Sequence, residues 1–251
     1  MKTEDYLSRI GLNTQDISRN LESLNILQRN HLFNIPFENL DIHWKRKIIL
    51  DEDLFAKKII DQNRGGFCYE LNGLFFKLLE ELGFKSKIIS ARVSNGKGGF
   101  GEEYDHLAIL TEIDEEEFLV DVGFGDFAAE PLKFALGFKQ QDRNGVFLIR
   151  KHDAEYFEVV KKKDSEWTSE YIFKEIRRDL SEFEGMCDFH QTSAESHFTT
   201  KKVCSIMTET GRKTLTNDKY IETNHGEKIE TAIIAAEEFA ATLNREFGIK
   251  I

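Results

Sequence analysis

The chain has 251 residues, 40% of them hydrophobic, and 17 glycines, which is the composition of an ordinary globular protein with a sizeable core. Its 34 Lys and Arg against 45 Asp and Glu give a net charge of −11, and such a surface repels phosphates, which argues against nucleic acid as a partner. No apolar run approaches 18 residues and the N-terminus lacks a secretory segment, so we expect no membrane association and a cytoplasmic protein whose three cysteines are reduced.

The first third of the chain is predicted to be helical. Leucines recur at near-helical spacing after Ile17, and a second helix is predicted to start at Asp51. A third helix is predicted from Cys68 to Leu82, because its apolar residues fall on one face. Gly83 then stands where a helix C-terminus favours a left-handed residue.

Short alternating segments, typical of antiparallel strands, fill the middle third at 87–93, 106–110, 118–122, 146–149, 156–160 and 171–173. The last third combines a helix-like stretch near 181–187, strands near 202–207 and 213–215, and an amphipathic helix over 231–247. We therefore predict an α+β fold in three parts: a helical part (1–83), a central antiparallel β part in the form of a small barrel (84–185) and a part that mixes helix and strand (186–251).

The most informative segment is Arg64–Asn72, which reads Arg-Gly-Gly-Phe-Cys-Tyr-Glu-Leu-Asn. Two glycines allow a tight turn, and Cys68 then falls in the first turn of an apolar-faced helix. There the unpaired backbone N–H groups and the helix dipole favour a thiolate with a lowered pKa. The alternative is that Cys68 is a small buried hydrophobic residue, as free cysteines often are.

A nucleophilic thiol also needs a base and a group that orients the base. His106 opens an apolar strand, and Asp121 is predicted to lie inside the strand 118–122, where a carboxylate is costly unless it is paired. Alone, His106 is more simply a hydrogen-bonded structural residue and Asp121 an acid satisfied by backbone amides. Together, a helix-start Cys followed by a strand-borne His and Asp form a candidate Cys-His-Asp triad of the cysteine-protease kind.

These segments resemble the arylamine N-acetyltransferase family. The family's Pro-Phe-Glu-Asn-Leu motif is present at 36–40, its Arg-Gly-Gly-x-Cys-x-Glu-x-Asn motif at 64–72, its Val-Asp-Val-Gly-Phe-Gly stretch at 120–125 and its Ser-x-Phe-Thr motif at 196–199. The resemblance implies that Cys68 carries the acetyl group, that His106 is the base and that Asp121 orients it. It also implies a fold made of an N-terminal helical bundle, a central antiparallel β-barrel and a C-terminal α/β lid, in agreement with the three parts predicted above.

By this resemblance, the chain transfers an acetyl group from acetyl-CoA to an arylamine, arylhydrazine or N-hydroxyarylamine in a ping-pong reaction through an acetyl-cysteine. Acetyl-CoA is then a donor substrate, and no metal is expected. The resemblance places Phe37, Phe124 and Phe198 at the aromatic substrate, while plain core packing accounts for most of the 21 Phe. Glu102, Glu103 and Asp105 would oppose the CoA phosphates, which we expect elsewhere.

Two other function classes share parts of this pattern. A Cys-His-Asp hydrolase or a transglutaminase-like enzyme would use the same residue order, and a non-catalytic binding module would keep the fold without the chemistry. A separate group, Cys187 and His190 with His197 and Cys204, supplies zinc-ligand residue types, but its spacing matches no common zinc finger. The motifs at 36–40 and 120–125 favour acetyl transfer over hydrolysis.

Overall fold

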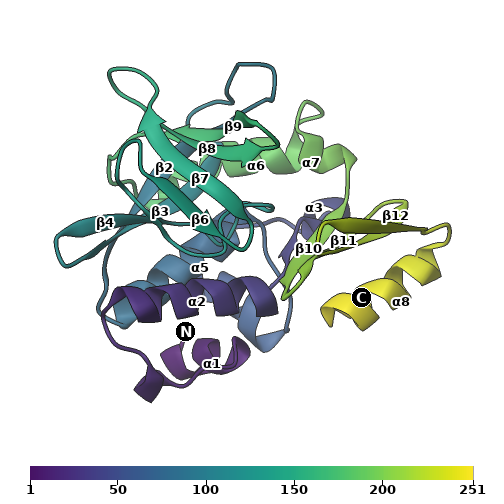
Figure 1. The fold of residues 1–251 in the computed structure, drawn as a ribbon. Helices are drawn as coiled ribbons and strands as arrows, with labels where there is room; N and C mark the ends of the chain where they lie inside the picture. Colours follow the sequence, from purple (N-terminus) through teal and green to yellow (C-terminus); the bar gives the residue numbers. More distant parts are fainter. Residues whose placement is uncertain (251) are drawn as a thin grey trace.

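The helices of the first third lie together beneath the barrel in the computed structural model, which describes residues 1–250 (Figure 1). Side chains start two of these helices: Asn20 accepts the Ser23 N–H, and Asp51 accepts the N–H groups of Asp53 and Leu54. The elements of this part are α1 (Thr3–Arg9), a 3₁₀ turn (Thr14–Asp16), α2 (Leu21–Asn34), β1 (Phe37–Glu38), α3 (Leu40–His43), α4 (Glu52–Ala56), a π-helical turn η2 (Lys57–Asp61) and α5 (Cys68–Glu81).

Eight antiparallel strands form a nearly closed barrel above these helices, in the order β5-β4-β3-β2-β9-β8-β7-β6 (Figure 1). The strands are β2 (Lys85–Val93), β3 (His106–Ile113), β4 (Glu116–Val120), β5 (Leu132–Lys133), β6 (Lys139–Asp142), β7 (Gly145–Lys151), β8 (Phe157–Lys163) and β9 (Glu166–Phe173). The two edges are joined by one side chain: the amide of Gln140 on β6 accepts the N–H of Lys133 on β5 and donates to its carbonyl. This contact covers edges that would otherwise be free to pair with another chain.

A second antiparallel sheet and a terminal helix follow the barrel. A 3₁₀ turn (Leu180–Phe183), α6 (Glu184–Thr192) and α7 (His197–Thr200) lead into β10 (Val203–Thr208), β11 (Gly211–Thr216), β12 (Lys219–Asn224) and β13 (Glu227–Ala232), and α8 (Ala236–Phe247) packs on this sheet. The short strand β1 also joins this sheet, because Phe37 pairs with Ser205. Residues near the start of the chain and near its end therefore share one sheet.

The hydrophobic core consists of three clusters. One lies between the helices of the first third and one side of the barrel, one fills the barrel, and one lies between α8 and the second sheet. The cluster between the helices and the barrel contains Cys68, whereas the cluster inside the barrel has Phe124 packed against it. The boundary between these two clusters is where the candidate site lies.

The α+β class with its central antiparallel barrel is confirmed, and the helix predicted from Cys68 to Leu82 is observed as α5. Three details differ. The strand β4 ends at Val120, so Asp121 lies just beyond the strand instead of inside it. The strands β12 and β13 were not predicted, and the last helix begins at Ala236 because β13 continues to Ala232. The domain boundaries after 83 and 185 stay predictions.

No helix among residues 1–250 is long and apolar enough to span a membrane.

Candidate active site

Cys68 is the first residue of α5, and it is 3% exposed. The approach to this helix is tight at Gly65: a Cβ there would lie 2.0 Å from the Pro36 carbonyl oxygen, so that only glycine fits. Gly66 accepts the N–H of Glu38 and forms a bridge to Phe37. The Arg-Gly-Gly motif therefore places the start of α5 against the Pro-Phe-Glu motif.

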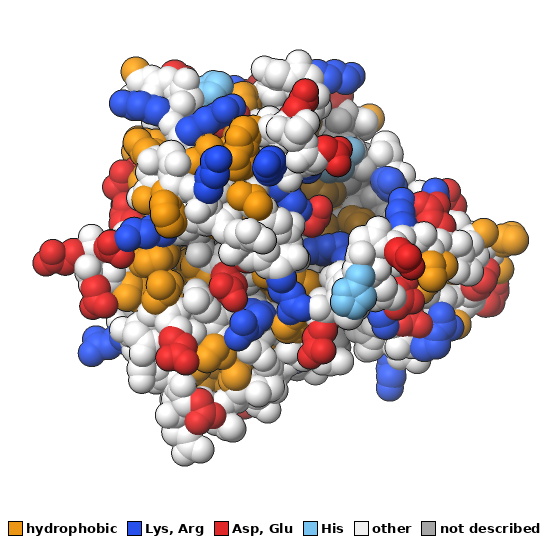
Figure 2. Space-filling model, in the orientation of Figure 1, with side chains coloured by type: hydrophobic (Ala, Val, Ile, Leu, Met, Phe, Trp, Pro, Cys, Tyr) orange, Lys and Arg blue, Asp and Glu red, His pale blue; other side chains and the backbone are white. Residues whose placement is uncertain are grey.

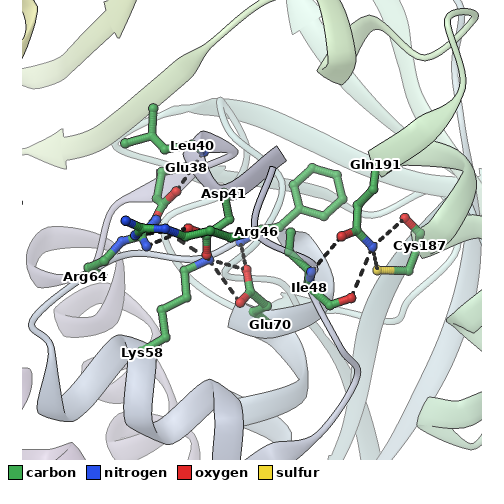
Figure 3. A network of polar contacts seen from close by, with 11 residues as sticks. Glu38, Leu40, Asp41, Arg46, Ile48, Lys58, Arg64, Glu70, Cys187 and Gln191 are labelled. Atoms are coloured by element: carbon green, nitrogen blue, oxygen red, sulfur yellow. Dashed lines mark hydrogen bonds and ion pairs between the residues drawn. The ribbon is translucent and has the colours of Figure 1, made fainter. Parts of the chain in front are cut away.

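A buried cluster of five charged side chains holds this junction on the helical side, and we call it the ion cluster: Glu38, Asp41, Lys58, Arg64 and Glu70 (Figure 3). Lys58 Nζ lies 2.9 Å from Asp41 Oδ2 and 2.8 Å from Glu70 Oε2, and Arg64 pairs with Asp41 and Glu38. Burial alone would raise the pKa of Asp41, but Lys58 and Arg64 outweigh it and hold that pKa below its usual value. Glu70 also accepts the Phe67 N–H at 2.8 Å, which ties the cluster to the first turn of α5.

Asn72 connects α5 to the barrel side of the site. It lies four residues after Cys68, on the same face of the helix. Its side-chain amide donates to Asp121 Oδ1 at 2.9 Å and to the Leu107 carbonyl, and its oxygen accepts the Val122 N–H. A Cβ on Gly123 would lie 3.0 Å from Cys68 Cα and 2.8 Å from the Asn72 amide nitrogen, so the loop after β4 rests directly on the start of α5. These contacts hold the loop that carries Asp121 against the first turn of α5.

Asp121 is 1% exposed, and hydrogen-bond donors surround both of its oxygens. Oδ1 accepts from Asn72 and from the Gly123 N–H at 2.9 Å, while Oδ2 lies 2.7 Å from His106 Nε2 and accepts from the Tyr171 hydroxyl at 3.2 Å. We call this set of donors the Asp121 cage. The carboxylate only accepts, so His106 Nε2 carries a hydrogen and Nδ1 keeps its lone pair.

The expectation that the pKa of the Cys68 thiol is lowered is wrong for the protein without substrate. Burial raises the pKa of Cys68 well above its ordinary value, and the charges of Cys187, Asp105 and Asp121 raise it further, while the Tyr69 N–H acts the other way. Burial likewise raises the pKa of Cys187, to about 12, and that of Cys204. The buried site of the substrate-free protein therefore favours the neutral thiol of Cys68.

The three phenylalanines named from the resemblance fall into two groups. Phe198 packs edge-on against Phe67 with ring centroids 4.6 Å apart, and Phe37 contacts both rings. Phe124 packs instead against the His106 ring, at 5.0 Å. Figure 2 shows a hollow between the barrel and the second sheet, with hydrophobic side chains deep inside it and charged side chains of both signs around its rim.

The residues with zinc-ligand chemistry are not gathered together. Among residues 1–250, no group of three or more His, Cys, Asp or Glu is arranged to hold a metal ion. Cys187 and His190 both lie on α6, where Gln191 contacts Cys187 and Ile48 (Figure 3), while Cys204 lies on β10.

Sequence reasoning missed the two side chains that complete the site from outside the motifs. Lys58 follows Phe55 by three residues, on the apolar side of its helix, while its neighbour Lys57 is exposed, and this position is the signal available for it. Tyr171 lies in β9, 50 residues from Asp121, and nothing local to its sequence distinguishes it from a core tyrosine. Asn72 belongs to the motif at 64–72, but its hydrogen bond to Asp121 follows only from the structure.

A family model and the most similar known proteins point to the same family. A family model described as N-acetyltransferase matches residues 20–251. The arylamine N-acetyltransferase pineal gland isozyme NAT-3 of Gallus gallus is 30% identical over 275 residues, covering all of this chain and 95% of that protein, and the human arylamine N-acetyltransferase 1 is 28% identical with the same coverage.

Solved structures agree with the sequence relatives. A Bacillus cereus arylamine N-acetyltransferase with a Cys-His-Glu triad superposes with a TM-score of 0.92 at 26% identity, covering all of both chains. The Mycobacterium marinum arylamine N-acetyltransferase in complex with CoA gives a TM-score of 0.89 at 26% identity, covering 99% of this chain and 93% of that one. The chain belongs to the arylamine N-acetyltransferase family.

Proposed function

We propose that this enzyme moves an acetyl group from acetyl-CoA to an aromatic amine or hydrazine by way of Cys68, with His106 as the base and Asp121 as the group that orients it. The observation that carries these roles is the contact chain from α5 to the barrel: Asn72 on the helix of Cys68 binds Asp121, and Asp121 binds His106 Nε2 at 2.7 Å. It leaves His106 Nδ1 as the ring nitrogen available for the thiol proton.

The first half-reaction acetylates the cysteine. The Cys68 proton passes to His106 Nδ1, and the sulfur attacks the carbonyl carbon of the acetyl thioester. The bond between that carbon and the CoA sulfur breaks, and the CoA sulfur takes the proton back from His106 as it leaves. Asp121 stabilises the imidazolium that forms in between, through the hydrogen bond at Nε2.

The second half-reaction returns the thiol. The nitrogen of the acceptor attacks the carbonyl carbon of acetyl-Cys68, His106 accepts a proton from that nitrogen, and the carbon–sulfur bond breaks to give the acetylated amine. The Cys68 sulfur then regains the proton from His106. Phe37 and Phe198 on one side and Phe124 on the other supply aromatic surface for the acceptor, and they keep water from the acetyl-cysteine.

Mass spectrometry tests the assignment of the nucleophile. Acetyl-CoA without an amine should add one acetyl group to the wild-type chain at Cys68, and an arylamine should remove it. Cys68→Ala should take up no acetyl group. The matched controls Cys187→Ala and Cys204→Ala should be acetylated at Cys68 within about 3-fold of the wild-type rate, because these substitutions change only the packing around two cysteines that take no part in the reaction. A folded Cys68→Ala protein that transfers acetyl groups at the wild-type rate would overturn the mechanism.

The same experiment separates transfer from hydrolysis, the alternative considered from the sequence. A hydrolase of the same residue order would release acetate quickly after acetylation, so that little acetyl-cysteine would accumulate. A transferase keeps the acetyl group until an amine arrives. The lifetime of acetyl-Cys68 in buffer, compared with its lifetime after addition of an arylamine, therefore measures the preference directly.

A further inference from the structure

His190 is a buried histidine that the proposed reaction does not use. It lies on α6 and is 4% exposed. Its ring stacks on Tyr69, with centroids 6.2 Å apart, and meets Phe67 at 5.9 Å and Phe198 at 5.3 Å edge-on. Phe67 and Tyr69 are the two neighbours of Cys68 in the sequence. His190 therefore packs against the immediate surroundings of the nucleophile.

Both nitrogens of the His190 ring have polar partners. Nε2 lies 3.1 Å from Asp105 Oδ1 and 3.3 Å from the Asp105 carbonyl oxygen, and Nδ1 lies 3.2 Å from Ser196 Oγ. The two Asp105 oxygens accept only, so Nε2 carries a hydrogen. The Ser196 hydroxyl can then donate to Nδ1 while its oxygen accepts the Phe198 N–H at 3.3 Å. A neutral His190 ring satisfies all of these contacts at once.

The two partners of His190 belong to different sides of the site. Asp105 directly precedes His106, and its Oδ2 accepts the Val93 N–H on the neighbouring strand. Ser196 caps α7, the short helix that carries Phe198 into contact with Phe67. The His190 side chain thus links Asp105, next to the proposed base His106, to the short helix that carries Phe198.

We propose that His190 is a positioning residue that holds Phe198 at a fixed place relative to His106 and thereby sets the affinity for the aromatic acceptor and the resistance of acetyl-Cys68 to water. The inference rests on the proposed function, in which Phe198 lines the acceptor site. Cys68 and His106 have their own supports in the ion cluster and the Asp121 cage. Loss of the His190 link should therefore disturb the acceptor step and leave acetylation by acetyl-CoA nearly intact.

Two substitutions separate the polar link from packing. His190→Phe keeps an aromatic ring among Phe67, Tyr69 and Phe198 but removes both polar contacts, whereas His190→Gln keeps one donor and one acceptor. For His190→Phe we expect an arylamine KM raised about 10-fold and a several-fold shorter lifetime of acetyl-Cys68 in buffer. The reason is that one or two hydrogen bonds that hold the helix of Phe198 in place are lost. The rate of Cys68 acetylation should stay within about 3-fold of wild type. His190→Gln should recover most of the acceptor affinity.

Further variants decide the outcome if His190→Phe fails to fold. Ser196→Ala removes only the contact on the Phe198 side and should also raise the arylamine KM. Thr192→Ala, an exposed position on α6 whose hydroxyl bonds within the helix, is the matched control and should behave as wild type. A folded Ser196→Ala enzyme with the wild-type arylamine KM would overturn the proposal, because it lacks the hydroxyl that joins His190 to α7. An equal loss in both half-reactions would also overturn it, because that is the mark of a merely structural residue.

The experiment distinguishes this proposal from the proposed function. If the wild-type chain is not acetylated on Cys68 by acetyl-CoA, the proposed function fails. If the wild-type chain is acetylated and deacetylated by an arylamine, but the His190 variants do not separate these two steps, only the role of His190 fails.

Discussion

Two buried polar regions lie on opposite sides of Cys68, and they differ in the charge of their partners. On the helical side, the ion cluster sets three carboxylates against the charged Lys58 and Arg64. On the barrel side, Asp121 is held by the neutral donors Asn72, Tyr171 and the Gly123 N–H, together with the His106 ring. Both regions are almost fully removed from water.

The difference indicates a division of labour. In the ion cluster each carboxylate has a cation beside it, so the two cations offset most of the negative charge in place, and the cluster fixes the geometry of the α5 start. In the Asp121 cage the negative charge is solvated by neutral dipoles, and burial raises the pKa of Tyr171 well above its usual value, so that Tyr171 stays a neutral donor. The charge of Asp121 is then free to stabilise a proton arriving at His106.

The largest expected effect is on the Asp121 cage. In Asp121→Asn the new amide group would face donors that now point at a carboxylate, and the change removes the charge that stabilises the imidazolium. We expect the rate of Cys68 acetylation to fall by orders of magnitude, up to the loss of about 10⁴-fold in turnover that the equivalent change causes in a serine protease triad. The rate is measured by mass spectrometry after circular dichroism has shown a native fold.

The matched control is Asp126→Asn, an exposed acid in the same loop that pairs with Lys161. It should leave the acetylation rate unchanged. A folded Asp121→Asn enzyme that acetylates at the wild-type rate would show that the two regions do not differ in function and that Asp121 is structural.

The next effect is on the ion cluster and on stability. Lys58→Met removes the cation shared by Asp41 and Glu70 and leaves three buried carboxylates with only Arg64. We expect the free energy of unfolding to fall by about 3–5 kcal/mol, the cost of stranding a buried charge. Urea denaturation measures it, and the exposed neighbour Lys57→Met should change it by less than about 0.5 kcal/mol. If folded Lys58→Met lost little stability but much of its acetylation rate, the ion cluster would serve the reaction and not the fold, contrary to the comparison of the two regions.

The smallest expected effect concerns His31, a buried histidine that, unlike His106, has no carboxylate partner. His31 has the Tyr6 hydroxyl 2.6 Å from Nδ1, and burial, with a contribution from the Arg9 charge, lowers its pKa to about 3. Because the folded pKa lies below the unfolded value of about 6.5, the unfolded chain binds the proton first as the pH falls. The stability associated with neutral His31 is complete above about pH 6.5 and is lost as the pH falls towards 3.

The loss amounts to about 2 kcal/mol in the free energy of unfolding between pH 7 and pH 5. His31→Leu should remove this part of the pH dependence, whatever it does to the absolute stability, and the exposed His225→Leu should keep it. Urea denaturation at both pH values gives the two slopes. Equal slopes in the wild type and His31→Leu would contradict the idea that burial and the Arg9 charge hold His31 neutral.

Much of the site could be predicted from the sequence because its elements are local patterns. The glycine pair and the apolar face that follows it place Cys68 at a helix start, and the alternating segments place His106 at the beginning of a strand. These patterns depend on backbone geometry and periodicity over about ten residues, which a single sequence displays directly. The same holds for the order of helices, barrel and second sheet.

Other features were decided only by the tertiary structure, because they depend on contacts between residues far apart in the chain. Asp121 leaves its strand to meet Asn72, Lys58 enters the ion cluster, and His190 meets Asp105 across 85 residues. The raised pKa of Cys68 has the same origin: the helix start favours a thiolate locally, but full burial by the barrel and α6 outweighs that preference. Burial is a property of the assembled molecule, so no local pattern could have revealed it.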